Sequence, residues 1–175
     1  TRKTYEKGME SIPSESVCYP AKITHGHIMS LIEQGVTTIF HPCIPFERAE
    51  QKCAENHYNC PIVTSYPEVL RNNVDALRQD DSILYMDPFL PIYDKKRLSE
   101  RLCEELLPHF DSLTKEQIYN AVEKAWAEQE KFGDDVRKAG EEALEEVIRN
   151  SGSGIVLAGR PYHLDPEIHH GIPEL

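Results

Sequence analysis

The sequence predicts an α/β fold, in which a largely parallel β-sheet has helical cover and one long helix leads toward a second lobe. Short runs of β-branched, aliphatic and aromatic residues alternate with longer segments whose apolar residues recur at helical spacing. Such alternation is typical of a mainly parallel sheet. The long helical pattern, at about residues 114–150, would extend roughly 54 Å, which is longer than a small domain is wide.

The first helix is predicted to begin just after Cys18. Pro20 suits a first helical turn, where its missing N–H group is not needed, and Gly35 supplies a stop. Cys18 therefore lies at or just before a helix N-terminus, whose free backbone N–H groups favour a thiolate or another anion. Gly26, inside this helix, indicates either a close approach of another backbone or a tolerated helix glycine.

The same kinds of pattern predict the remaining elements. Residues 11–16, with one proline and three serines, are expected to form a loop. Strands are expected in the short apolar runs at 36–40, 62–66, 83–86 and 155–158. Helices are expected at 46–56, 67–78 and 95–107.

The long helix has a clear start and two weak points. Thr114 and Gln117 match a capping box, and the pattern runs to Asn150. Gly133 and Gly140 each cost on the order of 1 kcal/mol inside a helix, so the sequence allows a kink or break near residue 133. We therefore expect three parts: an α/β lobe at 1–113, a connecting helix at 114–150, and the first strand and loop of a truncated second lobe at 151–175.

Composition and charge exclude several classes of function. The net charge of −11 disfavours binding to nucleic acid or to anionic membranes, both of which require clustered Lys and Arg. No run of eighteen apolar residues is present, so no membrane-spanning helix is expected. The sequence contains no phosphate-binding loop of the Gly-x-x-x-x-Gly-Lys-Ser/Thr type, so we expect no ATPase activity from this chain.

The five cysteines are widely spaced and odd in number. This pattern favours a reducing, cytoplasmic setting in which thiols pack in the core or bind metal. Cys53 and Cys103 fall in predicted helices, where we expect them to be small buried hydrophobic residues. Cys18, Cys43 and Cys60 instead lie in predicted loops, each with a proline one or two positions away.

We expect these three loop thiols to meet at one end of the parallel sheet, because ligands of such sheets bind beyond the carboxyl ends of the strands. Three thiolates suit an iron–sulfur cluster with one iron left open to substrate. Zinc with three cysteines and one histidine is the competing metal site, and thiolate softness permits both. The candidate histidines for zinc are His25, His27, His41 and His57.

Several other residues are candidates for supporting roles. Lys22 and His25 are three positions apart on the predicted helix and share a face. His25 and His27 are suited to acid or base catalysis near neutral pH, or to simple packing and capping. Arg160 and His163 follow the last predicted strand, where Arg160 could pair with a phosphate or a carboxylate. His169 and His170 are candidates for a metal or for a solvated loop.

Three motifs resemble a known family. They are Ser-Glu-Ser-Val-Cys-Tyr-Pro-Ala-Lys with His-Gly-His at 14–27, Tyr-Asn-Cys-Pro-Ile-Val at 58–63, and Gly-Arg-Pro-Tyr-His-Leu-Asp-Pro-Glu-Ile-His-His-Gly-Ile-Pro at 159–173. They resemble the uncharacterised domain of CoA-substrate-specific enzyme activases, which is similar to the 2-hydroxyacyl-CoA dehydratase subunit family. The resemblance covers most of residues 14–175.

The resemblance implies α/β lobes and a [4Fe–4S] cluster held by cysteines, with Cys18, Cys43 and Cys60 as candidate ligands. It implies electron transfer linked to acyl-CoA chemistry, with an activator ATPase module or a dehydratase subunit as partner. Two alternatives remain open: a non-catalytic module that docks the activator ATPase without a cluster, and a zinc-stabilised structural domain.

Overall fold

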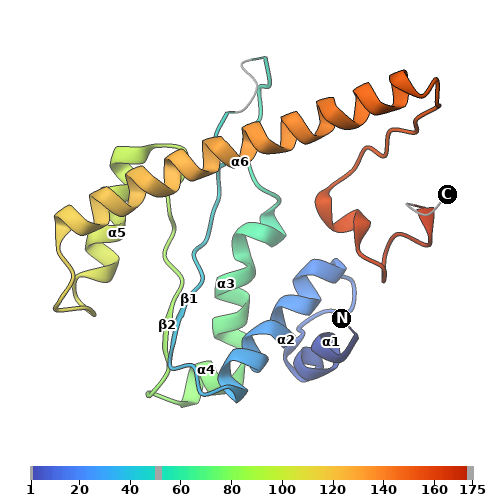
Figure 1. The fold of residues 1–175 in the computed structure, drawn as a ribbon. Coiled ribbons are helices and arrows are strands. Elements are labelled where there is room, and N and C mark those ends of the chain that lie inside the picture. The colour runs from blue at the N-terminus through green and yellow to red at the C-terminus, as the bar shows by residue number, and fades with distance from the viewer. Residues whose placement is uncertain (1, 50–52, 173–175) are drawn as a thin grey trace. The chain divides into compact units, whose positions relative to one another are not determined.

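The computed structural model describes residues 2–49 and 53–172 (Figure 1). The chain forms two compact units, residues 1–109 and residues 110–175. Each unit is described by itself below. Within the described residues, no helix is long and apolar enough to cross a membrane.

A short parallel sheet organises the first unit. Strand β1 (Thr38–Phe40) pairs with β2 (Leu84–Met86), with Ile39 opposite Tyr85. The pairing continues past the strands, because the Cys43 N–H donates to the Pro88 carbonyl at 2.9 Å. The predicted parallel strands at 36–40 and 83–86 are thus confirmed, and the described part of the chain contains this one two-stranded sheet.

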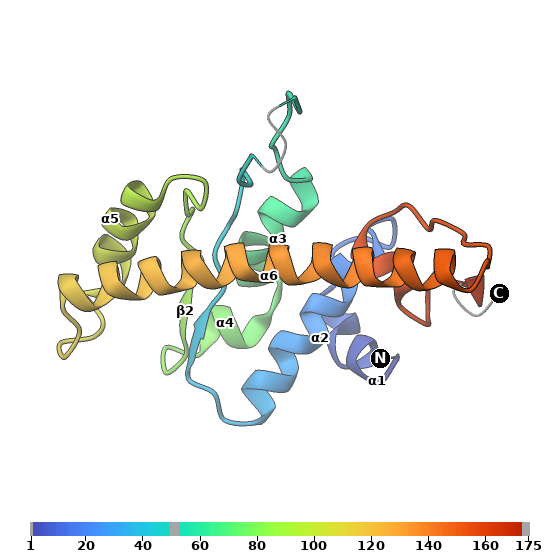
Figure 2. The same cartoon turned by 45° about the horizontal axis from the view of Figure 1, so that its top comes forward.

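Helices lie on both sides of the two strands (Figures 1 and 2). Helices α2 (Tyr19–Glu33), α3 (Pro61–Asn73) and α4 (Asp75–Gln79) lie on one side, and α5 (Lys95–Leu106) lies on the other. The main core joins the first side to the sheet and consists of the buried residues Ile28, Ile39, Leu70, Val74 and Tyr85. The predicted α/β fold with helical cover is confirmed.

The N-terminal segment contains a helix that the sequence analysis did not predict. Helix α1 (Arg2–Gly8) is followed by a 3-10 turn, η1 (Met9–Ser11), which overlaps the expected loop at Ser11 only. Helix α1 crosses α2 at Gly8 and Gly26, and a Cβ atom at Gly26 would lie 1.6 Å from the Thr4 carbonyl oxygen. The close backbone approach suggested by Gly26 is therefore confirmed, because no side chain fits at this crossing.

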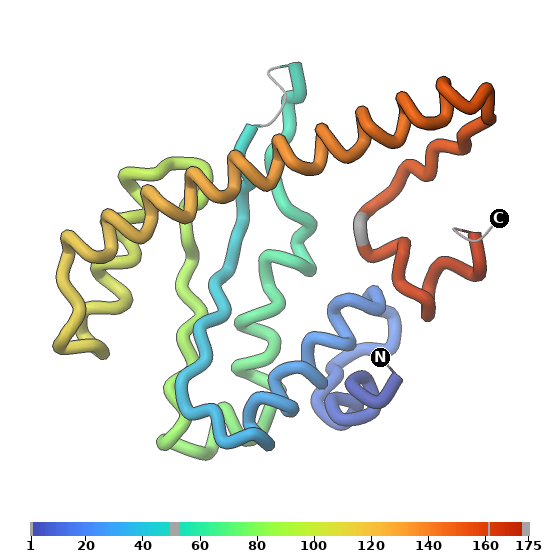
Figure 3. Tube along the Cα trace, in the orientation of Figure 1, coloured from blue at the N-terminus to red at the C-terminus, as the bar shows by residue number. Residues whose placement is uncertain are grey.

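Helix α6 (Lys115–Arg149) forms most of the second unit. Thr114 and Gln117 make the predicted capping box. The helix is continuous through Gly133 and Gly140, and its trace shows no break (Figure 3). Short-range ion pairs such as Lys131–Asp135 and Lys138–Glu142 lie along its surface. The second unit also contains the short 3-10 turn η2 (Pro161–Leu164).

Three sequence-based expectations about secondary structure were wrong. Residues 62–66 are helical, because Cys60 caps α3 and Pro61 occupies its first turn, and Pro67 lies within the same helix. Residues 46–49 and 53–56 are not helical, since Phe46 forms an antiparallel bridge with Tyr58, while residues 50–52 lie outside the described residues. Residues 155–158 are irregular, and Ile155 and Val156 are about nine-tenths exposed.

Candidate functional site

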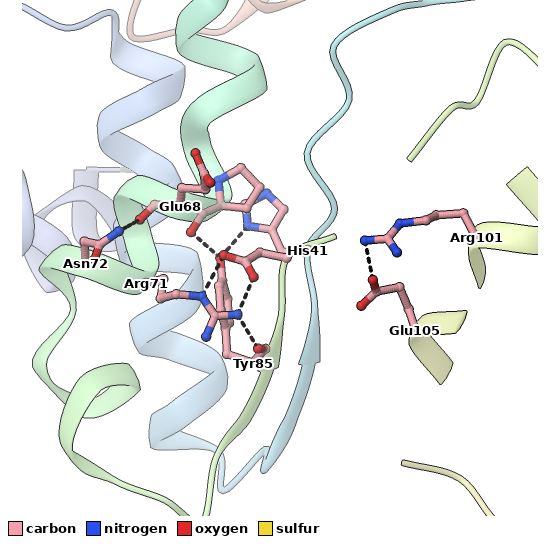
Figure 4. A network of polar contacts seen from close by, with 9 residues as sticks. His41, Glu68, Arg71, Asn72, Tyr85, Arg101 and Glu105 are labelled. Carbon is pink, nitrogen blue, oxygen red and sulfur yellow. Dashed lines mark hydrogen bonds and ion pairs between the residues drawn. The ribbon is translucent and has the colours of Figure 1, made fainter. Parts of the chain in front are cut away.

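The carboxyl ends of β1 and β2 carry a network of polar side chains (Figure 4). His41 directly follows β1, Asp87 directly follows β2, and Arg71 of α3 reaches Asp87. Tyr85, in β2, lies between His41 and Arg71. We call His41, Arg71, Tyr85 and Asp87 the strand-end network. It lies where an open parallel sheet binds its ligands.

The buried hydroxyl of Tyr85 fixes the protonation of His41. Tyr85 Oη donates to the Pro67 carbonyl oxygen at 3.1 Å and lies 3.1 Å from His41 Nδ1. A phenol has one hydrogen, so His41 must donate its Nδ1–H to Tyr85 Oη. Burial lowers the pKa of His41, and Asp87 partly opposes this effect. His41 is therefore a neutral imidazole near pH 7 and leaves Nε2 as an acceptor.

Arg71 links the helix to the strand end. Its Nε donates to Asp87 Oδ2 at 2.7 Å, and its Nη2 donates to Asp87 Oδ1 and, at 2.8 Å, to the Tyr85 carbonyl oxygen. The guanidinium also lies over the Tyr85 ring, with 5.3 Å between Cζ and the ring centroid. Hydrogen bonding to Asp87 raises the pKa of Arg71. Such a bidentate pair holds α3 against the end of β2.

Cys43 lies beside this network and is fully buried. Burial, together with the Glu68 and Asp87 carboxylates, raises the pKa of its thiol to about 11. A hydrogen bond from the Glu68 backbone N–H and the charge of Arg71 offset only part of this effect. Cys43 is therefore a neutral thiol at physiological pH, packed into the core in the manner of a small hydrophobic residue.

Cys18 and Cys60 have a different environment from Cys43. Each occupies the N-cap position of a helix, Cys18 for α2 and Cys60 for α3. Cys18 is exposed, with its Sγ 3.8 Å from Tyr66 Oη, and Cys60 is half-buried. Neither cysteine side chain accepts a hydrogen bond from the first turn of its helix.

The expectation about the other two cysteines is half correct. Cys103 is buried in α5, as expected. Cys53 is exposed, which contradicts the expected core packing. The physical reason is that residues 46–49 and 53–56 do not form the expected helix, which would have turned Cys53 inward.

The candidate supporting residues of α2 separate into two kinds. His25 is buried, and its Nδ1 lies 2.8 Å from Ser11 Oγ, while burial lowers its pKa. His27 is exposed. Lys22 makes a 3.5 Å ion pair with Glu15 rather than pointing to a thiol.

Arg160 and His163 belong to the second unit. The Arg160 backbone N–H donates to His163 Nδ1 at 3.2 Å, and the His163 ring packs edge-on against Tyr162. The expected position of Arg160 after a strand is wrong, because residues 155–158 are not a strand. His163 acts here as a cap for a short turn.

The three candidate cluster cysteines do not fit a common metal group in this conformation. Among residues 2–49 and 53–172, no three His, Cys, Asp or Glu side chains gather closely enough to hold a metal ion. Cys43 is fully buried, and burial raises the pKa of its thiol. Cys18 and Cys60 occupy the starts of two different helices, α2 and α3.

A cluster of three aromatic rings lies on the loops that follow the two strands. Phe46 packs against Tyr58, with 4.4 Å between ring centroids, and against Tyr93 at 5.6 Å. Phe46 and Tyr58 come from the loop after β1, and Tyr93 comes from the loop after β2. Tyr58 is 68% exposed and Tyr93 is 43% exposed. We call these three residues the aromatic cluster.

Sequence patterns pointed to only part of this region. The position of Asp87 follows from the expected strand at 83–86, because Asp87 comes directly after it. Arg71 and Tyr85 were missed, since nothing local marks a pair of residues that meet 14 positions apart. The aromatic cluster was missed because residues 46–56 were expected to be helical. The run of aromatic and proline residues at 88–93 was the available signal for its second half.

The fold and the site together define an α/β domain whose strand-end polar groups bond to one another and whose outer loops expose aromatic rings. A family model described as the CoA enzyme activase uncharacterised domain matches residues 1–175, and the chain belongs to this family. No curated protein and no solved structure matches the chain. The family expected from the three sequence motifs is therefore confirmed.

Proposed function

We propose that this domain is a docking module of a CoA enzyme activase system, and that it binds an activator ATPase module through the aromatic cluster. The observation that supports this is the exposure of Tyr58 and Tyr93 on the loops where α/β sheets bind their ligands. Tyrosine is enriched among the residues that dominate protein–protein binding energy. Membership of the activase domain family supports a partner from the same enzyme system.

The chemistry of the neighbouring strand-end network also favours a binding role over catalysis. Asp87 is engaged by Arg71, and the Tyr85 hydroxyl is shared between His41 and Pro67. These contacts tie the network into the fold. A catalytic nucleophile would have to be accessible and ionisable, whereas the Cys43 thiol is buried and neutral.

Calorimetric titration of the chain with the purified activator ATPase tests this proposal. We expect Tyr58→Ala to weaken binding about tenfold or more, as for a central interface tyrosine. Tyr119→Ala is the matched control, because Tyr119 is also exposed but lies on α6. Equal affinity for the wild type and the Tyr58→Ala variant would contradict docking through the aromatic cluster.

Iron–sulfur-dependent electron transfer linked to acyl-CoA chemistry is the second candidate function. It is supported by Cys18 and Cys60, which both cap helices and are both at least partly accessible. A [4Fe–4S] cluster would supply one-electron chemistry when bound. In this candidate function Cys18 and Cys60 are the better ligands, Cys43 is the weakest, and a dehydratase subunit is the electron partner.

Anaerobic reconstitution with iron and sulfide separates the two candidates. A cluster would give a visible charge-transfer band that Cys18→Ala and Cys60→Ala weaken. If alanine variants of Cys18, Cys43 and Cys60 all kept the full band, the assignment of ligands would be wrong. Elemental analysis of protein purified without oxygen identifies the third possibility, a zinc-stabilised structural domain.

The free state of all five cysteines also supports our proposal of a reducing, cytoplasmic location.

A further inference from the structure

Helix α6 carries a stripe of exposed apolar side chains in its second half. Phe132, Val136, Leu144 and Ile148 are each more than half exposed. Their spacing places them on one side of the helix, which has 3.6 residues per turn. We call these four residues the apolar stripe. It lies in the second unit, whereas the aromatic cluster belongs to the first, so this surface is distinct from the docking site proposed above.

The middle of the apolar stripe is open. Ala139, Gly140 and Ala143 lie between its two halves and are exposed. A Cβ atom at Gly140 would have no neighbour within 4 Å, so no other segment of the described chain covers the helix at this point. Small residues here let the axis of a second helix come close. Large apolar side chains gathered on one uncovered side are typical of a protein–protein contact.

Four glutamates border the apolar stripe near the end of α6. Glu141 and Glu145 follow one edge of the stripe, and Glu142 and Glu146 follow the other. Glu142 makes a 3.8 Å ion pair with Lys138, whereas the other three glutamates have no ion pair within the described residues. Glu146 also lies in the last turn, where the helix dipole disfavours an anion. The borders therefore carry negative charge that the described chain leaves unbalanced.

We propose that the apolar stripe docks an amphipathic helix of a partner protein, and that Lys and Arg border the apolar face of that partner helix. Burial of apolar side chains supplies the attraction. The glutamates select a helix with basic borders, as the charged positions beside a coiled-coil seam do. A second copy of this chain is a poorer occupant, because residues 128–149 have a net charge of −4 and two such segments repel each other.

Three synthetic helical peptides of about 20 residues, which extend roughly 30 Å, test this proposal on the full chain. The first has leucines at heptad spacing with lysines beside them, the second has glutamates in place of those lysines, and the third has the composition of the first in scrambled order. Fluorescence anisotropy of each labelled peptide measures its affinity. We expect saturable binding of the first peptide, and binding of the other two to be weaker by about tenfold or more. Added salt should weaken binding of the first peptide.

Variants of the chain locate the binding. Leu144→Ser should weaken binding of the basic peptide about tenfold, because it removes one buried apolar contact. Leu164→Ser is the matched control, since Leu164 is about as exposed but lies in η2. Glu145→Gln should weaken binding about two- to threefold at low salt, as for one exposed ion pair. Glu116→Gln, in the first turn of α6, should leave it unchanged.

Ile148→Ser repeats the test at a second position of the stripe, and far-ultraviolet circular dichroism reports whether each variant is folded. Equal affinities for the basic and acidic peptides would overturn the proposal, as would equal losses in Leu144→Ser and Leu164→Ser. Analytical ultracentrifugation tests the other occupant. A dimer of the chain alone that Leu144→Ser dissociates would assign the stripe to a second copy and overturn the basic partner. The activator ATPase takes no part in these measurements, so their failure leaves the proposed function standing.

Discussion

The strand-end network and the aromatic cluster follow the same two strands, yet they are organised in opposite ways. In the network, Tyr85 is 5% exposed and its hydroxyl is bonded on two sides. In the aromatic cluster, Tyr58 is 68% exposed and packs mainly against Phe46. One region fixes the ends of the strands against α3, and the other leaves aromatic surface available. The comparison shows that residues following strands can serve folding and binding within a few positions of each other.

The largest effect on stability is expected from truncating Tyr85, the tyrosine of the strand-end network. Tyr85→Ala removes a buried ring, two hydrogen bonds of its hydroxyl and a contact with Arg71. We expect the free energy of unfolding to fall by about 4 kcal/mol, as for other large aromatic residues in cores. Urea unfolding followed by far-ultraviolet circular dichroism measures this change. A loss below about 1 kcal/mol would mean that the network is not closely packed.

High pH should destabilise the fold through Cys43, which lies beside the strand-end network. Its thiol has a pKa of about 11 in the folded chain, against an ordinary value of 9.0. Between these values the unfolded chain releases the proton first, so stability falls as the pH rises through this window. Burial also raises the pKa of Tyr85, which extends the same trend to higher pH.

Urea midpoints measured from pH 8 to pH 10 test this alkaline effect. The wild type should lose on the order of 1–2 kcal/mol across the window, and Cys43→Ala should lose distinctly less. Cys53→Ala is the control, because Cys53 is exposed. Parallel pH profiles for all three proteins would show that the Cys43 thiol is not protected.

Acid should destabilise the same region through His41. Burial lowers the pKa of His41 and of His25 below the ordinary value of 6.5. As the pH falls below about 6.5, the unfolded chain takes up protons before the folded chain does, and stability decreases. His41→Gln should flatten this dependence, which thermal unfolding between pH 7.5 and pH 5 would reveal. An unchanged slope would indicate that His41 is already charged in the fold.

The smallest effect on stability is expected from truncating Tyr58 of the aromatic cluster. Tyr58→Ala removes an exposed ring and should change the free energy of unfolding by about 0.5 kcal/mol or less. Measured beside Tyr85→Ala under the same conditions, it gives the same substitution in two environments. A loss of 2 kcal/mol or more for Tyr58→Ala would erase the distinction between the two regions.

Local patterns predicted those parts of the fold that depend on local physics. Helix α2 has a proline in its first turn and ends before Gly35, whose φ of +78° suits glycine. Helix α6 has a complete capping box at Thr114. Such signals act over a few residues, so one sequence is enough to find them.

The errors arose where distant contacts decide the structure. Ile62 and Val63 are β-branched and resemble a strand, but Pro61 starts a helix whose later turns bury Leu70 in the core. Residues 46–49 have a helical pattern, but Phe46 pairs with Tyr58 instead. The same distinction between local and distant contacts holds for the site. The position of Asp87 follows from the strand directly before it, whereas the position of Arg71 depends on how α3 packs against that strand.

The continuity of α6 has a mechanical consequence. Its 35 residues span roughly 52 Å at 1.5 Å per residue, without an interruption at either glycine. A rod of that length amplifies rotation: a tilt of about 5° at one end moves the other end by roughly 5 Å. A small change in the packing of Ile118 and Val122, the two buried residues near its start, is therefore enough to displace the far end by more than the width of a side-chain contact.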